Sequence, residues 1–131
     1  MRRIDRLYII YGVIDLSGVS GVTFSKLNHI AFLMQKELNV KLGYSFIETH
    51  YGLRSSELLD DIEMLKSVGF IMMVSGWYYR GKNAPDYDIS EDLPEPVIYN
   101  IKRYLRRSDR ELFEYIQKHY KGKIILPYML R

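Results

Sequence analysis

The segment 55–70, SSELLDDIEMLKSVGF, constrains the fold more than any other part of the chain. Ser55 and Ser56 are both suited to cap a helix N-terminus, and the apolar residues after them recur at helical spacing. Gly69 fits the position after a helix, where a positive φ is often needed. We therefore predict a helix that starts near Ser56 and ends before Gly69. Its expected buried stripe is Leu58, Leu59, Ile62, Leu65 and Val68.

A hairpin is predicted directly after this helix. The runs FIMMVSGWYYR and PDYDIS have the apolar and aromatic character of strands, and GKNA lies between them. Gly and Asn at this point favour a turn, so the expected tip of the hairpin is 81–85. Arg80 and Lys82 would then flank Gly81 at the tip.

The remaining segments are predicted to be mainly helical. The first helix covers about 5–16, and a second begins near Thr23 or Ser25, which are possible caps. Residues 44–51, YSFIETHY, suit a short strand. Pro94 and Pro96 make a stiff link before a helix over about 97–107. Ser108 and Glu111 have the spacing of a capping box, which predicts a fifth helix that ends before Gly122 and an apolar tail, KIILPYMLR.

This order of elements predicts a mainly helical α+β fold. A helix followed by a hairpin, preceded by two helices, is the arrangement of a winged helix-turn-helix with a β-hairpin wing. We expect a winged-helix unit over residues 1–93. Residues 94–131 would add C-terminal helices that pack on that unit, so that the chain forms one compact domain.

The charges of the chain are segregated along the sequence. Residues 51–101 contain four basic and nine acidic residues, whereas residues 102–131 contain nine basic and three acidic ones. The overall net charge of +3 hides this contrast. A basic C-terminal segment beside an acidic middle suggests an anionic partner for the former, or attraction between two copies of the chain.

A family resemblance covers roughly the first 70 residues. FSKLNHIAFLMQKELNVKLGYSFIETHYGLRSSELLDDIEMLKSVGFI resembles a family of mostly uncharacterised prokaryotic winged-helix proteins, and is similar to the Panacea antitoxin-type domain. Leu53 departs from that pattern, in which Pro usually follows Tyr-Gly. The matching positions are Lys26, Leu27, Leu33, Gln35, Lys36, Glu37, Gly43, Tyr44, Phe46, Tyr51, Gly52, Ser55, Glu57, Leu58, Leu65, Gly69 and Ile71.

The resemblance implies a small regulator. Such a protein is either a DNA-binding transcription factor or an antitoxin-like protein that binds another protein. The family pattern carries no catalytic residues to transfer. A homodimer is the expected assembly, on general grounds for winged-helix proteins with apolar terminal helices.

Three groups of residues are predicted to contact double-stranded DNA. They lie at the tip of the wing, at the N-terminus of the third helix, where backbone N–H groups attract phosphate, and on the basic fourth helix. Binding of one duplex by all three groups requires these cations to converge on one surface. The predicted contacts are Arg80 and Lys82, then Arg54, Ser55 and Ser56, then Arg103, Arg106 and Arg107.

The third helix is itself unusually acidic for a DNA reader. Carboxylates facing phosphates would repel them, although one carboxylate can accept a hydrogen bond from cytosine. The alternatives are a solvated face or a protein-binding face. The predicted protein contacts on such a face are Glu57, Asp61 and Met64.

Catalysis, cofactors and metals are not predicted. His29, His50 and His119 are isolated, no phosphate-binding or nucleophile motif is present, and cysteine is absent. His29 is expected to be partly exposed or hydrogen-bonded. No apolar run approaches the ~20 residues that span a bilayer. The apolar N-terminal run is interrupted by Asp5 and Asp15, so we expect a cytoplasmic protein without a signal peptide.

Overall fold

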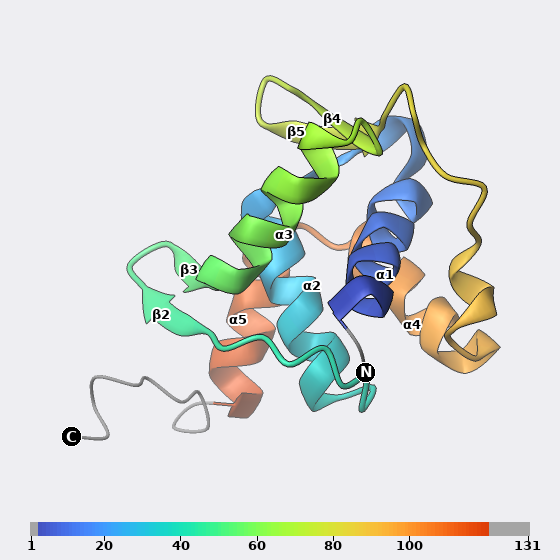
Figure 1. Cartoon of the computed structure of the whole chain (residues 1–131). Helices are drawn as coiled ribbons and strands as arrows, with labels where there is room; N and C mark the ends of the chain where they lie inside the picture. Colours follow the sequence, from blue (N-terminus) through green and yellow to red (C-terminus); the bar gives the residue numbers. More distant parts are fainter. Residues whose placement is uncertain (1–2, 121–131) are drawn as a thin grey trace.

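A computed structural model describes residues 3–120 of the chain (Figure 1). The described part is mainly helical, with two small sheets, so the predicted α+β class is confirmed. The helices are α1 (Arg3–Leu16), α2 (Phe24–Lys36), α3 (Ser56–Ser67), α4 (Glu95–Arg106) and α5 (Asp109–Tyr120), with short 3₁₀ turns η1 (Gly18–Ser20) and η2 (Ile89–Glu91). The strands are β1 (Val22–Thr23), β2 (Ile47–Thr49), β3 (Gly52–Arg54), β4 (Ile71–Val74) and β5 (Trp77–Arg80).

Two helices form the centre of the molecule. Residues 9–14 of α1 and residues 27–34 of α2 are all buried, and a helix that is buried all round must have neighbours on every side. α2 packs against α4 and α5, while α3 packs against α1 and β4. In Figure 1, α3 lies in front of α2 and the β4–β5 hairpin lies at the top of the view, whereas the connection between α4 and α5 passes behind α1 and α2.

The hairpin after α3 differs from the prediction. Its strands are β4 and β5, and its turn is Ser75–Gly76, so 81–85 is not its tip and PDYDIS forms no strand. Ser75 and Gly76 have φ values of 51° and 85°, which is the pair of positive φ angles that a tight two-residue hairpin turn requires. β1 pairs with the far side of β5, giving the strand order β1-β5-β4, and this added strand was not predicted.

A second hairpin lies between α2 and α3. The predicted strand 44–51 is only partly correct, because the strand is limited to β2, which pairs with β3. Tyr44 and Phe46 precede β2 in an irregular segment, and both are buried. Burial of their rings, rather than pairing of their backbone, holds this segment against the core.

The buried stripe of α3 is rotated relative to the prediction. Ser55 caps the helix as expected, accepting a hydrogen bond from Leu58 N at 3.2 Å. The residues that face the core are Leu58, Asp61, Ile62 and Leu65. Leu59 and Val68, expected inside, are 42% and 44% exposed. Asp61 occupies the inward position at the i+3 spacing from Leu58, and apolar content alone did not reveal it.

The C-terminal helices follow their sequence signals. Pro96 lies in the first turn of α4. Ser108 and Glu111 exchange backbone-to-side-chain hydrogen bonds of 3.1 and 3.2 Å, which is the predicted capping box at the start of α5. The predicted tail KIILPYMLR lies outside the described residues. None of the helices in the described part is long and apolar enough to cross a bilayer.

Candidate nucleic-acid interface

The residues predicted at the N-terminus of α3 have separate roles. Ser55 is only 2% exposed: its N–H donates to Asn28 Oδ1 and its hydroxyl caps α3, so it is not accessible to a phosphate. Ser56 is exposed and Arg54 is half-buried. Arg54 directs Nη1 to the carbonyl of Leu53 at 2.7 Å. All three line a mainly apolar groove of about 410 Å³ with Ile47 and Leu59.

The cations predicted for the wing tip are instead at the base of the hairpin. Arg80 is the last residue of β5, and its Nη1 lies 3.7 Å from Asp15 Oδ1 at the end of α1. Lys82 is exposed and follows the strand. The true tip, Ser75–Gly76, carries no charge. The hairpin therefore lacks a cationic tip that could follow a DNA groove.

The basic residues of α4 lie together on the exposed side of the helix. The inner face of the helix buries Ile98, Ile101 and Tyr104. The opposite face exposes four cations within six residues, and Arg110 in the first turn of α5 is also exposed, with Nε 3.8 Å from Glu114. None of the four forms an ion pair with another described residue. We call this set the basic surface: Lys102, Arg103, Arg106, Arg107 and Arg110.

The predicted convergence of all cations on one surface is not what the fold produces. Arg80 lies beside the end of α1, on the hairpin at the top of Figure 1, whereas the α4–α5 connection lies lower in that view and passes behind α2. Among the predicted contacts outside α4, Arg54 is the exception. Its charge acts on Asp109 at the start of α5, where it helps to lower the pKa of that carboxyl.

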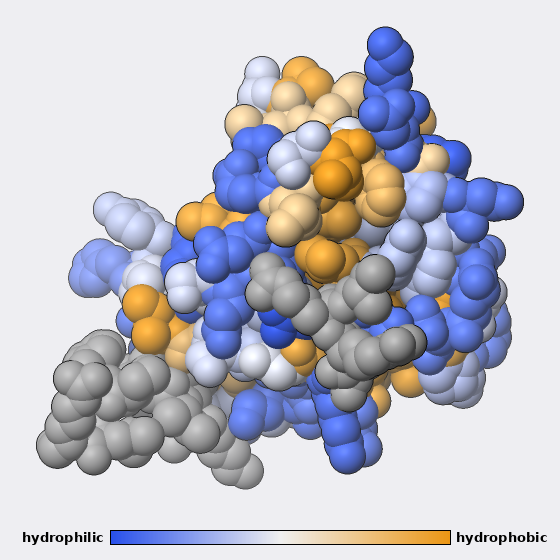
Figure 2. All heavy atoms as spheres, in the orientation of Figure 1, coloured by the Kyte–Doolittle hydropathy of each residue, from blue (hydrophilic) through white to orange (hydrophobic). Residues whose placement is uncertain are grey.

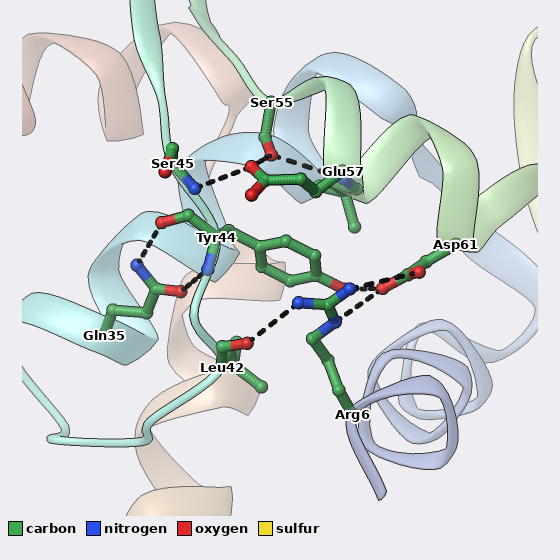
Figure 3. Close-up of polar contacts among 9 residues, drawn as sticks. Arg6, Gln35, Leu42, Tyr44, Ser45, Ser55, Glu57 and Asp61 are labelled. Atoms are coloured by element: carbon green, nitrogen blue, oxygen red, sulfur yellow. Dashed lines mark hydrogen bonds and ion pairs between the residues drawn. The ribbon is translucent and has the colours of Figure 1, made fainter. Parts of the chain in front are cut away.

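Asp61, predicted to face a protein partner, is buried and takes part in an internal network (Figure 3). Arg6 Nε donates to Asp61 Oδ2 at 2.7 Å, and the hydroxyl of Tyr44 donates to the same oxygen at 2.6 Å. Arg6 also lies 4.5 Å from the centre of the Tyr44 ring and donates to Leu42 O. A buried carboxylate needs such partners. Asp61 therefore joins α3 to α1 and cannot belong to an exposed contact face.

Neighbouring motif residues hold the segment before β2 (Figure 3). The side-chain amide of Gln35 both donates to Tyr44 O and accepts from Tyr44 N, at 3.1 and 2.8 Å. Glu57 accepts from Ser45 N at 2.9 Å. Glu57 is half-buried and its carboxylate is occupied by this hydrogen bond. Met64, which is 45% exposed, is therefore the one exposed member of the predicted protein-binding set.

His29 has a structural role, in which both ring nitrogens form hydrogen bonds inside the protein. It is fully buried, so the expectation of partial exposure is wrong and that of hydrogen bonding is confirmed. Its Nε2 accepts from Leu53 N at 3.0 Å, so Nδ1 carries the proton and donates to Asp109 Oδ1 at 2.5 Å. Ser25 donates to the other oxygen of Asp109. A Ser-Asp-His set in this order contains no activated nucleophile, because the hydroxyl donates to the carboxylate.

The pKa of Asp109 is lowered. Burial alone would raise it, but the hydrogen bonds from His29 and Ser25, with the charge of Arg54, outweigh burial and favour the carboxylate. Gly52 completes this arrangement. It has a φ of 128°, and a Cβ there would lie 2.6 Å from His29 Nε2. The contact explains why glycine occupies this position in the Tyr-Gly pair.

A cluster around Glu37 was not predicted from the sequence. At the end of α2, its carboxylate accepts from the hydroxyls of Tyr104 at 2.7 Å, Tyr120 at 3.0 Å and Tyr115. Burial, reinforced by Glu37, raises the pKa of Tyr120 to about 12, so the hydroxyl stays protonated and donates. Arg103 and Arg107 line a small pocket of about 110 Å³ beside this cluster. The cluster fixes the inner side of the helices that carry the basic surface.

The face formed by α3 and the hairpin has a different chemistry. Figure 2 shows hydrophobic residues at the surface over these elements, among hydrophilic ones. The large apolar side chains exposed on this face are Leu59, Met64, Val68, Met72, Met73, Val74 and Trp77.

The described part of the chain contains no group of three or more His, Asp or Glu side chains placed to hold a metal.

Comparisons with known proteins add no assignment: no protein-family model, no curated protein and no solved structure matches this chain.

Proposed function

We propose that this chain is a winged-helix regulator that binds duplex DNA through the basic surface of α4 and α5 and not through α3. The observation that carries the proposal is the group of four exposed cations at 102–107, without ion pairs to other described residues. Duplex DNA carries one charge per ~1.7 Å of its axis, so a compact cationic surface gains free energy by releasing counterions.

The order of elements supports the winged-helix part of the proposal. α1, β1, α2, α3, β4 and β5 follow one another, and β1 pairs with β5 beside the β4–β5 hairpin. Helices α2 and α3 with this hairpin correspond to a helix-turn-helix and its wing. The β2–β3 hairpin would then be an insertion between the two helices. The resemblance of residues 24–71 to prokaryotic winged-helix proteins points to the same arrangement.

The exposed chemistry of α3 argues against its use as the reading helix. Asp60 and Glu63 are exposed, and the one basic residue of the helix, Lys66, lies 3.3 Å from Glu63. A carboxylate about 4 Å from a phosphate costs about 1 kcal/mol in water and more at lower dielectric. Non-specific DNA binding is worth only about 5–8 kcal/mol. Two such contacts would remove a substantial part of it.

Fluorescence anisotropy with a random duplex tests the proposal. The triple variant Arg103/Arg106/Arg107→Ala should weaken binding at least about tenfold at about 50 mM salt and reduce the slope of log K against log[salt] by about 2.7. The triple variant Lys66/Arg80/Lys82→Ala removes the same charge from the α3 and hairpin side and should change the affinity less than about threefold. Equal losses in both, or no binding by the unmodified protein, would overturn the proposal.

A second candidate is an antitoxin-like or adaptor module that binds a protein through α3. The exposure of Leu59, Met64 and Val68 favours it, because apolar side chains grouped on one face suit a protein partner. Of the residues predicted for this face, Met64 and in part Glu57 are accessible to a protein partner, whereas Asp61 is buried. Retention of a partner by the unmodified chain, its loss in Met64→Lys and its persistence in Tyr99→Lys would support this function.

A further inference from the structure

β4 is an edge strand without the usual protection. The sheet order β1-β5-β4 leaves one side of β4 unpaired within the described residues. Its sequence is IMMV, with no charge, no proline and no bulge in its register with β5. Edge strands of soluble proteins usually carry one of these features, because an open apolar edge is a template for another strand.

The register of the hairpin shows which backbone groups face the open side. Val74 and Trp77 flank the two-residue turn and form a hydrogen-bonded pair, and such pairs alternate along an antiparallel hairpin. The N–H and C=O of Met72 therefore point to β5. Those of Ile71 and Met73 point outward. In the described part of the chain, no backbone hydrogen bond beyond the β4–β5 pairing uses either residue.

The side chains around this edge are apolar on both faces of the strand. Met72, Met73 and Val74 are 48%, 49% and 50% exposed. Trp77 of β5 and Val68 at the end of α3 lie close in sequence to this strand and are also more than 40% exposed. A partner that only added backbone hydrogen bonds would leave these side chains in water. The edge is best covered by a partner that contributes a strand and apolar surface on both sides.

We propose that the partner is a second copy of this chain, joined by antiparallel pairing of β4 with β4 across a two-fold axis. With the axis at Met73, the two Met73 residues would exchange N–H···O=C bonds. Ile71 of each copy would face Ser75 of the other. The two sheets would then become one continuous sheet, with Met72 and Val74 of each copy covering those of the other.

Charge favours a second copy over a charged partner. Residues 67–79 contain no ionisable acid or base other than tyrosine, so two copies can meet here without bringing like charges together. A two-fold interface requires a self-complementary surface. When two β4 strands pair antiparallel with Met73 on the two-fold axis, each strand presents the same surface to the other, which satisfies this requirement. The proposal does not depend on DNA binding, because the basic surface lies on other elements.

Sedimentation of the full chain tests the assembly. At about 100 µM the unmodified protein should have twice the 15.6 kDa mass of the chain. Met73→Lys places two like charges at the axis and should raise the dimer dissociation constant at least about thirtyfold. Tyr99→Lys, at a position on α4 that is 57% exposed, makes the same chemical change elsewhere and should leave the dimer intact.

Disulfide trapping locates the interface independently of mass. The chain has no cysteine, so single substitutions report one position each. Cα atoms of a hydrogen-bonded antiparallel pair are ~5.5 Å apart, within the ~4.4–6.8 Å range of disulfides. Met73→Cys should form a covalent dimer under mild oxidation, and Tyr99→Cys should not. A monomer at the stated concentration, a dimer that persists in Met73→Lys, or equal cross-linking at both positions would overturn the proposal.

Discussion

Helices α3 and α4 have the same length and opposite surfaces. Each has twelve residues and buries one face in the core. The outward face of α3 exposes Asp60 and Glu63 beside apolar Leu59 and Met64. The outward face of α4 exposes the cations of the basic surface. In the proposed winged-helix arrangement α3 would be the DNA-reading helix, but its exposed carboxylates repel phosphate, whereas the exposed cations of α4 attract it.

Topology and surface chemistry are determined by different sets of residues. The order of helices and strands fixes which elements pack together, and it is determined by buried residues. Binding depends on exposed residues, which the same fold leaves free to vary. An assignment of function to α3 from its place in the chain would therefore ignore its charge.

The acidic helix α3 and the basic surface of α4 and α5 also differ in the carboxylates that join them to the central helices α1 and α2. α3 is joined to α1 by Asp61, whose side chain is fully buried against Arg6. α5 is joined to α2 by Asp109, whose side chain remains 34% exposed beside His29. A fully buried carboxylate and a partly solvated one should differ in their contribution to stability.

The largest effect is expected for Asp61→Ala. Removing this carboxylate leaves Arg6 and the Tyr44 hydroxyl without it in a mostly dry site, which should lower the free energy of unfolding by about 3–5 kcal/mol. Urea denaturation measures the change. The matched control is Asp60→Ala, one position away and exposed, with an expected change below about 0.5 kcal/mol. Similar values for both variants would contradict the internal role of Asp61.

A smaller effect is expected for Asp109→Asn. At neutral pH the loss should be about 1–3 kcal/mol, because the charge-assisted hydrogen bond to His29 becomes a neutral one. The folded pKa of Asp109 is lowered, so its contribution is complete above the unfolded value of about 4 and is lost as the pH falls through the folded value. The difference between the two proteins should therefore shrink in acid.

Urea denaturation at about pH 7 and about pH 3 checks this dependence. Glu114→Gln serves as the control, because Glu114 is an exposed residue of the same helix whose ion-pair contact with Arg110 is long. A difference between Asp109→Asn and the unmodified protein that stays constant with pH would show that the ionised carboxylate does not stabilise the fold.

The smallest effect is expected when the charge of α3 is reversed. Asp60/Glu63→Lys changes the net charge by four in the positive direction, yet DNA affinity should rise less than about threefold at about 150 mM salt, where charges more than ~8 Å apart are screened. Anisotropy with the random duplex measures this. An increase of a hundredfold would place α3 against DNA and remove the contrast between the two helices.

Much of the fold could be predicted because its signals are local. Ser55, the Ser108–Glu111 pair, Pro96 and Gly69 mark helix ends through hydrogen bonds or backbone angles that involve only nearby residues. The hairpin turn has a local signal too, because Ser75–Gly76 suits a two-residue turn, but GKNA is an equally good turn sequence nearby, so the sequence does not distinguish the two. β1 could not be found this way, since a two-residue strand depends on its distant partner β5.

The site was harder to predict because its residues meet through tertiary contacts. Asp61 and Arg6 are 55 positions apart, and His29 and Asp109 are 80 apart. Solvent exposure also decides which charged side chains can contact a ligand, and exposure cannot be read from the sequence alone. Asp61 and Ser55 were expected outside and are inside.

Several of the residues that carry the family resemblance have structural roles in this chain. Gln35 holds the backbone of Tyr44, Gly52 makes room for His29, and Glu57 holds Ser45. These are contacts that position the segment between α2 and α3. Residues with such roles determine the local structure and not what the protein binds, so the resemblance is compatible with both a DNA-binding and a protein-binding function.

Amide chemical-shift changes on titration with a short random duplex would map the DNA-binding surface residue by residue. We expect the changes to cluster at 102–110, in the basic surface, and the amides of α3 and of the tip of the β4–β5 hairpin to stay unchanged. Changes concentrated in α3 and that hairpin, with the amides of α4 and α5 unaffected, would show that DNA binds through α3 and not through the basic surface.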